Sequence, residues 1–300
     1  MAGPGSGPDD TTWTPGRSPA PQPSEAPTWL PPPSTLELGA SGGSRGLDST
    51  GSPTDPRPLL EPGTIVGEQY RVDGIIGAGA MGVVYRAHHL RLDRPVALKL
   101  QRTASLDHAR LEREARAMAK LSHPHVVAVY DVGTWASDVY IAMEFVDGWS
   151  LRAWLEATKR PWKVALDTCM QAGRGLAAAH AAGIIHRDFK PDNVLVGMDG
   201  RVRVADFGIA RGSAMPVRAE GEDGNALGPD LTATGGMPGT PAYMAPEQFG
   251  GVADAKSDVF SFCVVLYEAL FGQRPFGGAS LPELLFNVSR GNVRPPPDTS

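Results

Sequence analysis

Apolar residues are spread unevenly along the chain of 300 residues, and their distribution predicts which part of it folds. Residues 1–62 hold half of the 28 prolines, together with many Gly and Ser residues and few aliphatic ones. Such a segment buries too little apolar surface to offset the ~1–2 kcal/mol per residue that ordering a backbone costs. We therefore expect residues 1–62 to form a disordered, partly polyproline II arm, which is a tether or a docking site for a proline-reading partner.

From residue 63 onward, short apolar segments separated by turns predict regular structure. The stretches QYRVDGIIG, GVVYRAHHL and RPVALKL are typical of strands. SLDHARLEREARAMAKL follows with Leu111, Ala115 and Met118 at helical spacing, and HVVAVYDVG and DVYIAMEFV predict two further strands. The pattern therefore predicts a lobe of five strands and one helix over residues 63–146.

The pattern becomes helical after Asp147-Gly148. PWKVALDTCMQAGRGLAAAHAAG predicts a long helix whose small residues suit a buried position, and NVLVG and RVRVAD predict two short strands. Helices are expected over residues 257–272 and near 281–289. A β-rich lobe followed by a helical lobe over residues 147–300 predicts an α+β fold with an active-site cleft between the lobes.

Charge and cysteine content narrow the function classes. The net charge of -5 gives no reason to expect nucleic acid or anionic lipid as a partner. Cys169 and Cys263 lie in apolar helical patterns, so we expect buried, reduced thiols and a cytoplasmic location. No signal peptide pattern is present, and the longest apolar run, VFSFCVVLYEALF, is short for a membrane span and contains Glu268. Membrane attachment of a longer parent protein stays open.

Two further features predict phosphate chemistry. In GAGAMG the glycines Gly77, Gly79 and Gly82 precede a strand sequence, which places them in a hairpin turn that can offer backbone N–H groups to polyphosphate. An ordinary β-turn would have the same composition. Lys99 in PVALKL faces inward and needs an anion, which is a phosphate, a carboxylate such as that of Glu114, or both. A solvated surface lysine is the alternative.

The stretch IIHRDFKPDNVLV encloses a polar loop between apolar runs that pin it to a core. Asn193 in this loop and Asp206, at the end of the strand VRVAD, together form the oxygen-rich arrangement that Mg²⁺ prefers. Each residue taken alone would more often be a turn residue.

The motifs IGAGAMGVVYRA, VALK, HRDFKPDN, DFG and GTPAYMAPE occur in the order and approximate spacing of the protein kinases. The chain over residues 69–295 resembles that family, and the last three motifs are most similar to bacterial serine/threonine kinases of the eukaryotic type. The resemblance implies a bilobal protein-kinase-like fold that uses ATP and Mg²⁺ to phosphorylate Ser or Thr of protein substrates.

The resemblance also implies a role for each motif residue. Asp188 would accept the proton of the substrate hydroxyl, and Lys190 would neutralise charge near the γ-phosphate. Lys99, paired with Glu114, would hold the α- and β-phosphates. Mg²⁺ would be held by Asn193 and Asp206. The nucleotide would contact Gly77, Ala78, Gly79, Gly82, Val84, Ala97, Lys99, Glu144, Phe145, Val146 and Leu195.

Control by phosphorylation is implied in the same way. Arg187 precedes Asp188, as in kinases whose activation loop is ordered by a new phosphate. We expect autophosphorylation, which can occur in trans on a second copy, at one or both of Thr232 and Thr234. The insertion GSAMPVRAEGEDGNALGPD would hinder substrate docking before that event.

The end of the sequence departs from the family pattern. In the family, the glutamate of APE, here Glu247, pairs with an arginine on a late helix, but the sequence stops at GNVRPPPDTS. Either the chain is a fragment of a longer protein or its lobe is incomplete, with Glu247 poorly compensated and apolar surface uncovered at residues 257–272. An ATP-binding but catalytically silent pseudokinase or scaffold is therefore the alternative function. A small-molecule kinase is disfavoured because GTPAYMAPEQF resembles a peptide-docking segment.

Overall fold

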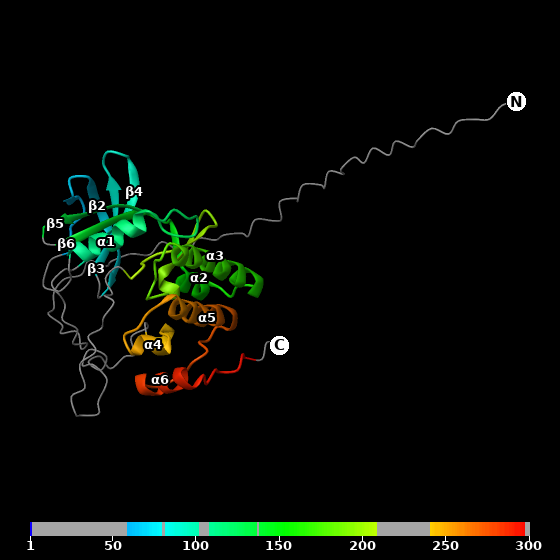
Figure 1. Cartoon of the computed structure of the whole chain (residues 1–300). Helices are drawn as coiled ribbons and strands as arrows, with labels where there is room; N and C mark the ends of the chain where they lie inside the picture. Colours follow the sequence, from blue (N-terminus) through cyan, green and yellow to red (C-terminus); the bar gives the residue numbers. More distant parts are fainter. Residues whose placement is uncertain (2–58, 80–81, 102–107, 137, 209–240, 298–300) are drawn as a thin grey trace, which may run out of the picture. The chain divides into compact units, whose positions relative to one another are not determined.

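The computed structural model describes most of residues 63–300, where the sequence predicts two lobes (Figure 1). The described residues are Met1, 59–79, 82–101, 108–136, 138–208 and 241–297. Residues 2–58 of the predicted arm lie outside them, and so do Thr232 and Thr234.

The β-rich lobe is an antiparallel sheet with a single helix beside it (Figure 1). Its strands follow the order β1-β2-β3-β4-β6-β5. The elements are β1 (Ile65–Val66), β2 (Tyr70–Gly79), β3 (Gly82–His89), β4 (Arg94–Gln101), α1 (His108–Ala119), β5 (Val129–Trp135) and β6 (Asp138–Glu144). All five expected strands and the helix are therefore confirmed.

The prediction of only five strands was wrong, because β1 adds a sixth at the edge of the sheet. Strand β1 has two residues, and Val66 pairs with Tyr70 of β2. A segment this short shows no periodicity that could reveal it. The backbone N–H of Leu60 donates to the Tyr85 hydroxyl at 3.2 Å, so contact with the core of the sheet begins before residue 63.

The second lobe is mainly helical and carries a small antiparallel sheet in the order β7-β8-β9. Its elements are β7 (Gly148–Ser150), α2 (Leu151–Ala157), α3 (Trp162–Ala181), η1 (Pro191–Asn193), β8 (Val194–Gly197), β9 (Val202–Val204), η3 (Pro241–Tyr243), α4 (Pro246–Phe249), α5 (Ala255–Phe271) and α6 (Leu281–Arg290). The sequence patterns had indicated α3, β8, β9, α5 and α6, but not the shorter elements.

Helix α3 lies at the centre of the second lobe, where it packs against α5 and β9. Its small side chains permit this close packing, since Ala172 and Ala179 are buried in the same cluster as Val265 of α5. Gly175 approaches the backbone carbonyl of His125 so closely that a Cβ atom would clash with it. The prediction of a buried, small-residue helix is confirmed, and this helix supports the polar loop that follows it.

Helix α5 is capped at both ends by its own sequence. The Asp254 carboxylate accepts from the backbone N–H groups of Lys256 and Ser257 at 2.8 and 3.0 Å, and Gly272 ends the helix at φ 69°. Between the caps one face is buried, but Cys263 is exposed. The expectation that Cys263 is buried was therefore wrong, because an apolar pattern all round a helix does not tell which face is covered. Cys169 of α3 is buried as expected.

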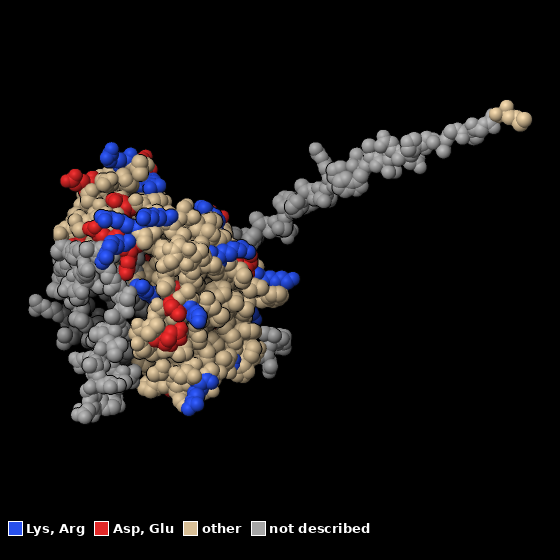
Figure 2. All heavy atoms as spheres, viewed as in Figure 1, with Lys and Arg blue, Asp and Glu red and all other residues tan. Residues whose placement is uncertain are grey.

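Basic and acidic side chains are interspersed over the described part of the face in Figure 2, and neither sign gathers into one large area there. Among the described residues, no helix combines the length and apolar character needed to cross a bilayer.

Candidate active site

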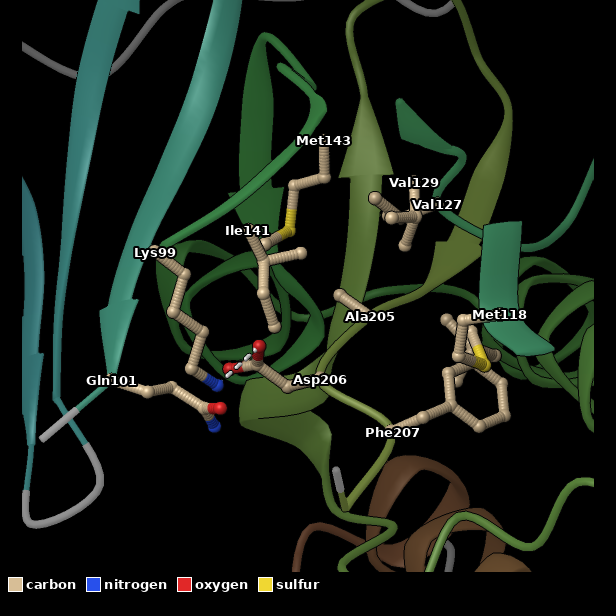
Figure 3. Close-up of a pocket in the computed structure, with 11 residues that line it drawn as sticks. Lys99, Gln101, Met118, Val127, Val129, Ile141, Met143, Ala205, Asp206 and Phe207 are labelled. Atoms are coloured by element: carbon tan, nitrogen blue, oxygen red, sulfur yellow. Dashed lines mark hydrogen bonds and ion pairs between the residues drawn. The ribbon is translucent and has the colours of Figure 1, made fainter. Parts of the chain in front are cut away.

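Lys99 and Asp206 meet in the lining of a small pocket (Figure 3). Lys99 belongs to β4, and Asp206 follows β9 in the chain. The Lys99 Nζ atom lies 2.8 Å from the Asp206 Oδ1 atom. Only 12% of the Lys99 side chain is exposed, so the inward orientation predicted for this lysine is confirmed. Asp206 has a φ of 55°, a left-handed conformation that costs energy in a residue with a Cβ atom. The fold thus stabilises a strained backbone in order to aim this carboxylate.

The rest of the pocket is mostly apolar. Met118, Ile141, Met143 and Phe207 line it, as Figure 3 shows. Gln101, two positions after Lys99 on the same face of β4, also lines it and is 1% exposed. Its Oε1 atom has no hydrogen-bond partner among the residues that the structure describes. A buried amide oxygen without a partner is costly, so this acceptor is a polar group of the site that sequence reasoning missed.

Glu114 does not pair with Lys99 in this structure. Its Oε1 atom lies 3.8 Å from Arg187 Nη1, and the one ion-pair partner of Lys99 is Asp206, among the residues that the structure describes. The predicted Lys99–Glu114 pair is thus replaced by two others, Lys99–Asp206 and Glu114–Arg187. The spacing of the sequence places Glu114 on the correct helix. It does not indicate whether the Glu114 carboxylate pairs with Lys99 or with Arg187.

The polar loop predicted to carry the chemistry is closed by its own hydrogen bonds. Lys190 Nζ lies 2.8 Å from Asp188 Oδ2, and Asn193 Nδ2 donates to the Asp188 carbonyl at 2.8 Å. The Asn193 carbonyl in turn accepts from the N–H of Ala205 at 2.8 Å, which brings this residue beside Asp206. Asp188, Lys190, Asn193 and Asp206 are therefore neighbours, although they come from separate motifs.

Asp258 of α5 fixes the start of this loop through hydrogen bonds to its backbone. Its Oδ2 and Oδ1 atoms accept from the backbone N–H groups of His186 and Arg187 at 2.7 and 2.8 Å, and His180 Nε2 lies 2.8 Å from Oδ2. The Asp258 side chain is 1% exposed, and these donors offset the cost of burying its charge. Arg187 has a φ of 66°, so the carboxylate stabilises a second strained residue directly before Asp188.

His186 is fully buried, and its hydrogen bonds define a neutral ring. The N–H of Asp188 donates to Nδ1 at 3.3 Å, so the proton is on Nε2, which donates to the Ala205 carbonyl at 2.9 Å. Burial lowers the pKa of His186, against the opposing effect of Asp258. The ring therefore ties the polar loop to the residue before Asp206 without adding a charge.

The glycine loop is a hairpin, as predicted from the strand sequence that follows it. Gly77 pairs with Val84, and Gly79 pairs with Gly82, across β2 and β3. Gly82 has a φ of 143°, and a Cβ atom there would clash with the Leu100 carbonyl, so this position requires glycine.

The apolar residues expected around the adenine lie in one cluster. Ala97 is buried in it, while Val84, Val146 and Leu195 are partly buried and pack against it. These residues come from β3, β4, β8 and the segment after β6, so the fold alone brings them together. This cluster adjoins the Lys99–Asp206 pocket through Ile141 and Met143, which belong to both.

Glu144, whose backbone is expected to meet the adenine edge, is fixed by Arg203 of β9. Arg203 Nε lies 2.9 Å from Glu144 Oε1, and Nη2 lies 2.7 Å from Asp199 Oδ2. The Arg203 side chain is 4% exposed, and its hydrogen bonds to Asp199 outweigh burial and raise its pKa. Nothing in the alternating pattern VRV distinguishes such an anchor from a solvent-facing strand residue.

Glu247 has a partner within the chain. Its Oε1 atom accepts from Ser257 Oγ at 2.7 Å. Val259 of α5 is 52% exposed.

The two lobes and the site between β4, β9 and the polar loop define a protein kinase, and the chain belongs to this family. The family described as "Protein kinase domain" matches residues 70–291. The resemblance noted from the motifs is thereby confirmed.

Curated relatives carry the comparison further. The chain is 40% identical over 235 residues to "Serine/threonine-protein kinase PknL" of Mycobacterium tuberculosis, covering 74% of this chain and 56% of the relative. It is 39% identical over 247 residues to "Serine/threonine-protein kinase PknA" of the same species, covering 78% and 53%. It is 38% identical over 229 residues to "Probable serine/threonine-protein kinase PknB" of Lactococcus lactis, covering 74% of this chain and 34% of the relative. The chain thus spans about half the length of the first two relatives.

Proposed function

We propose that residues 63–300 form a serine/threonine protein kinase domain that transfers the γ-phosphoryl group of ATP to Ser or Thr hydroxyls of protein substrates. The observation that carries this proposal is that the pairs Lys99–Asp206 and Lys190–Asp188, each at 2.8 Å, are joined through Asn193. Asn193 donates to the Asp188 carbonyl and accepts from the N–H of Ala205, directly before Asp206, both at 2.8 Å. The names of the curated relatives support the same activity. Because ATP is the donor, we expect the domain to act in the cytoplasm.

Each residue in the site has a task in this reaction. Asp188 accepts the proton of the attacking hydroxyl, and Lys190, already 2.8 Å from it, neutralises charge that develops on the transferred group. Lys99 exchanges Asp206 for the α- and β-phosphates when nucleotide enters. Phosphoryl transfer depends mainly on positioning and charge neutralisation, and the loop held by Asp258 provides the positioning.

Asn193 and Asp206 fit a magnesium site because each retains a side-chain oxygen. Lys99 binds only Oδ1 of Asp206, and Asn193 binds the Asp188 carbonyl through its Nδ2 group. Hard oxygen donors of this kind suit Mg²⁺, which supplies charge neutralisation between the phosphates. We propose that these two residues hold it.

A nucleotide-binding scaffold is the second candidate function. It is favoured by one observation, the placement of Glu114 at 3.8 Å from Arg187 instead of beside Lys99. In this arrangement Lys99 lacks its predicted carboxylate partner for phosphate binding.

Labelled ATP distinguishes these functions. The purified chain is incubated with γ-labelled ATP, Mg²⁺ and a general acceptor protein, beside an Asp188→Asn variant, and nucleotide binding is measured on both. Labelling by the wild type alone supports the kinase, and equal labelling by both overturns it. Binding without labelling by either favours the scaffold.

We also propose that Thr232 and Thr234 are autophosphorylated in trans. The double Thr→Ala variant should then lose most phosphate incorporation, and mass spectrometry of the wild type should find phosphate at these positions. Unchanged incorporation in the variant would contradict this assignment.

A further inference from the structure

Gln101 is the last residue of β4 and carries a buried polar group inside the pocket. Its side chain is 1% exposed, and within the described part of the chain its Oε1 atom has no hydrogen-bond partner. A buried acceptor without a donor is unfavourable in a folded protein. The presence of this amide is explained if a donor reaches Oε1 at another stage of the reaction.

Lys99 is the side chain that can supply this donor. Besides Gln101, the polar side chains among the described residues that line the pocket are Lys99 and Asp206, and an ionised aspartate only accepts. Lys99 and Gln101 are two positions apart on one strand, so both side chains leave the same face of β4. Figure 3 shows the Gln101 amide pointing toward the Lys99 ammonium and the Asp206 carboxylate.

The Lys99 ammonium has N–H donors to spare. It carries three of them, and its one hydrogen bond to a described residue is the contact of 2.8 Å with Asp206 Oδ1. Glu114, the other acceptor expected for it, lies 3.8 Å from Arg187 instead. The proposed reaction draws the ammonium from Asp206 toward the phosphates. Gln101 Oε1 is then the side-chain acceptor of the pocket that can hold Lys99 from the protein side.

An amide holds a cation differently from a carboxylate. Oε1 accepts from the ammonium without neutralising it, so the charge of Lys99 stays available to the α- and β-phosphates. The action of Gln101 is indirect, because its side chain is buried and the pocket, at about 20 Å³, has room for about one water molecule and not for a phosphate group. Gln101 also pairs with Gly82, which places it beside the hairpin expected to cover the phosphates.

We propose that Gln101 is a positioning residue for Lys99: its Oε1 atom accepts an N–H of Nζ when the ammonium leaves Asp206, and so fixes the cation against the α- and β-phosphates. This inference rests on the proposed kinase function. Removal of the amide should weaken binding of the phosphates and leave binding of adenosine unchanged. Because Oε1 loses no contact with a described residue, the same change should not lower the stability of the folded chain.

The test compares nucleotide binding with stability. Binding of ADP with Mg²⁺ and of adenosine to the full chain is measured by calorimetry, and stability is measured in urea. For Gln101→Met we expect the Kd for ADP to rise about fivefold, with an unchanged Kd for adenosine and a urea midpoint that is equal or higher.

Gln171→Met is the matched control. The Gln171 amide donates to Asp167 at 3.0 Å and accepts from the Val202 N–H at 3.3 Å, and it does not line the pocket. Its replacement should lower the urea midpoint and leave both Kd values unchanged, which is the opposite of the result expected for Gln101→Met.

A double-variant cycle tests whether Gln101 acts through Lys99. In a Lys99→Met background, Gln101→Met should change the Kd for ADP by less than about twofold. A larger change that persists in this background overturns the inference, because Gln101 would then act without the ammonium. An equal rise of the Kd for ADP and adenosine in the single variant, or no rise for either, overturns it as well.

Folding and kinase function are distinguished from this role. Gln101→Leu repeats the test with another apolar shape, and unfolding of both variants would overturn the inference, because the amide would then already support the free protein. A wild type that binds neither ligand overturns the kinase function and the inference together. Phosphorylation rates are recorded in parallel: binding changes as expected without phosphoryl transfer by the wild type would support the role of Gln101 and favour the scaffold.

Discussion

Arg203 fixes Glu144 by a contact of 2.9 Å between Nε and Oε1, and so connects β9 of the helical lobe to the end of β6. The Glu144 N–H also donates to the Ala128 carbonyl at 2.8 Å. The backbone expected to meet the adenine is thus held from two sides, by Ala128 directly before β5 and by the buried guanidinium of Arg203.

Replacement of Arg203 by Met should weaken nucleotide binding. Without the guanidinium the Glu144 carboxylate loses its main partner, and the adjoining backbone loses its fixed position. We expect the KM for ATP to rise about tenfold with a smaller change in kcat. Arg201→Met is the matched control, because Arg201 also binds Asp199, at 2.8 Å, but is half exposed and makes no contact with Glu144. Equal KM values for the two variants would contradict this role.

Replacement of the buried Asp258 carboxylate should lower both the free energy of unfolding and kcat. Asp258→Asn replaces one of the two oxygens that accept from His186 and Arg187 with a donor, so two N–H groups would then face each other. We expect the free energy of unfolding to fall by about 2–4 kcal/mol and kcat to fall at least tenfold. Urea denaturation and steady-state kinetics measure these changes. Glu156→Gln, at an exposed position of α2, should change the free energy of unfolding by less than about 0.5 kcal/mol.

Stability should decrease toward acid pH through His186. Burial lowers its pKa in the folded protein, whereas the unfolded chain takes up a proton near the ordinary value of 6.5. Below that value the unfolded state binds more protons, so the free energy of unfolding falls as pH falls from about 7.5 to about 5.5, by at most ~1.4 kcal/mol per pH unit for one group. The His186→Asn variant should show a shallower slope in urea titrations at several pH values. A slope equal to that of the wild type would mean that other groups cause it.

The two thiols should react at very different rates. Burial raises the pKa of Cys169 to about 12, while Cys263 is exposed on α5. With a disulfide reagent at mildly alkaline pH we expect one fast thiol, and Cys263→Ser should remove the fast phase whereas Cys169→Ser should retain it. Two slow thiols in the folded protein would show that Cys263 is covered in solution.

The elements that could be predicted from the sequence are those with a strong local pattern. Alternation revealed the five main strands, and helical spacing revealed α1, α3, α5 and α6. Gly77, Gly79 and Gly82 were placed in a hairpin because a strand sequence follows them. Strand β1, at two residues, has no pattern to read.

The sequence predicted which residues belong to the site, but it did not predict which of two possible partners each charged side chain contacts. Lys99 was expected to need an anion, and it has one, but the anion is Asp206 rather than Glu114. Asp258 and Arg203 act across separations of 72 (from His186) and 59 (from Glu144) residues along the chain, which only the folded protein brings together. A single sequence carries no local signal for such contacts.

Asp258 fixes the polar loop independently of the sheet in the other lobe. It holds the residues next to Asp188 from within the helical lobe, whereas Lys99 and the glycine hairpin belong to the sheet of the other lobe. In the proposed kinase, a swing of that sheet would admit ATP and release ADP while the loop that carries Asp188, the proposed proton acceptor, keeps its shape.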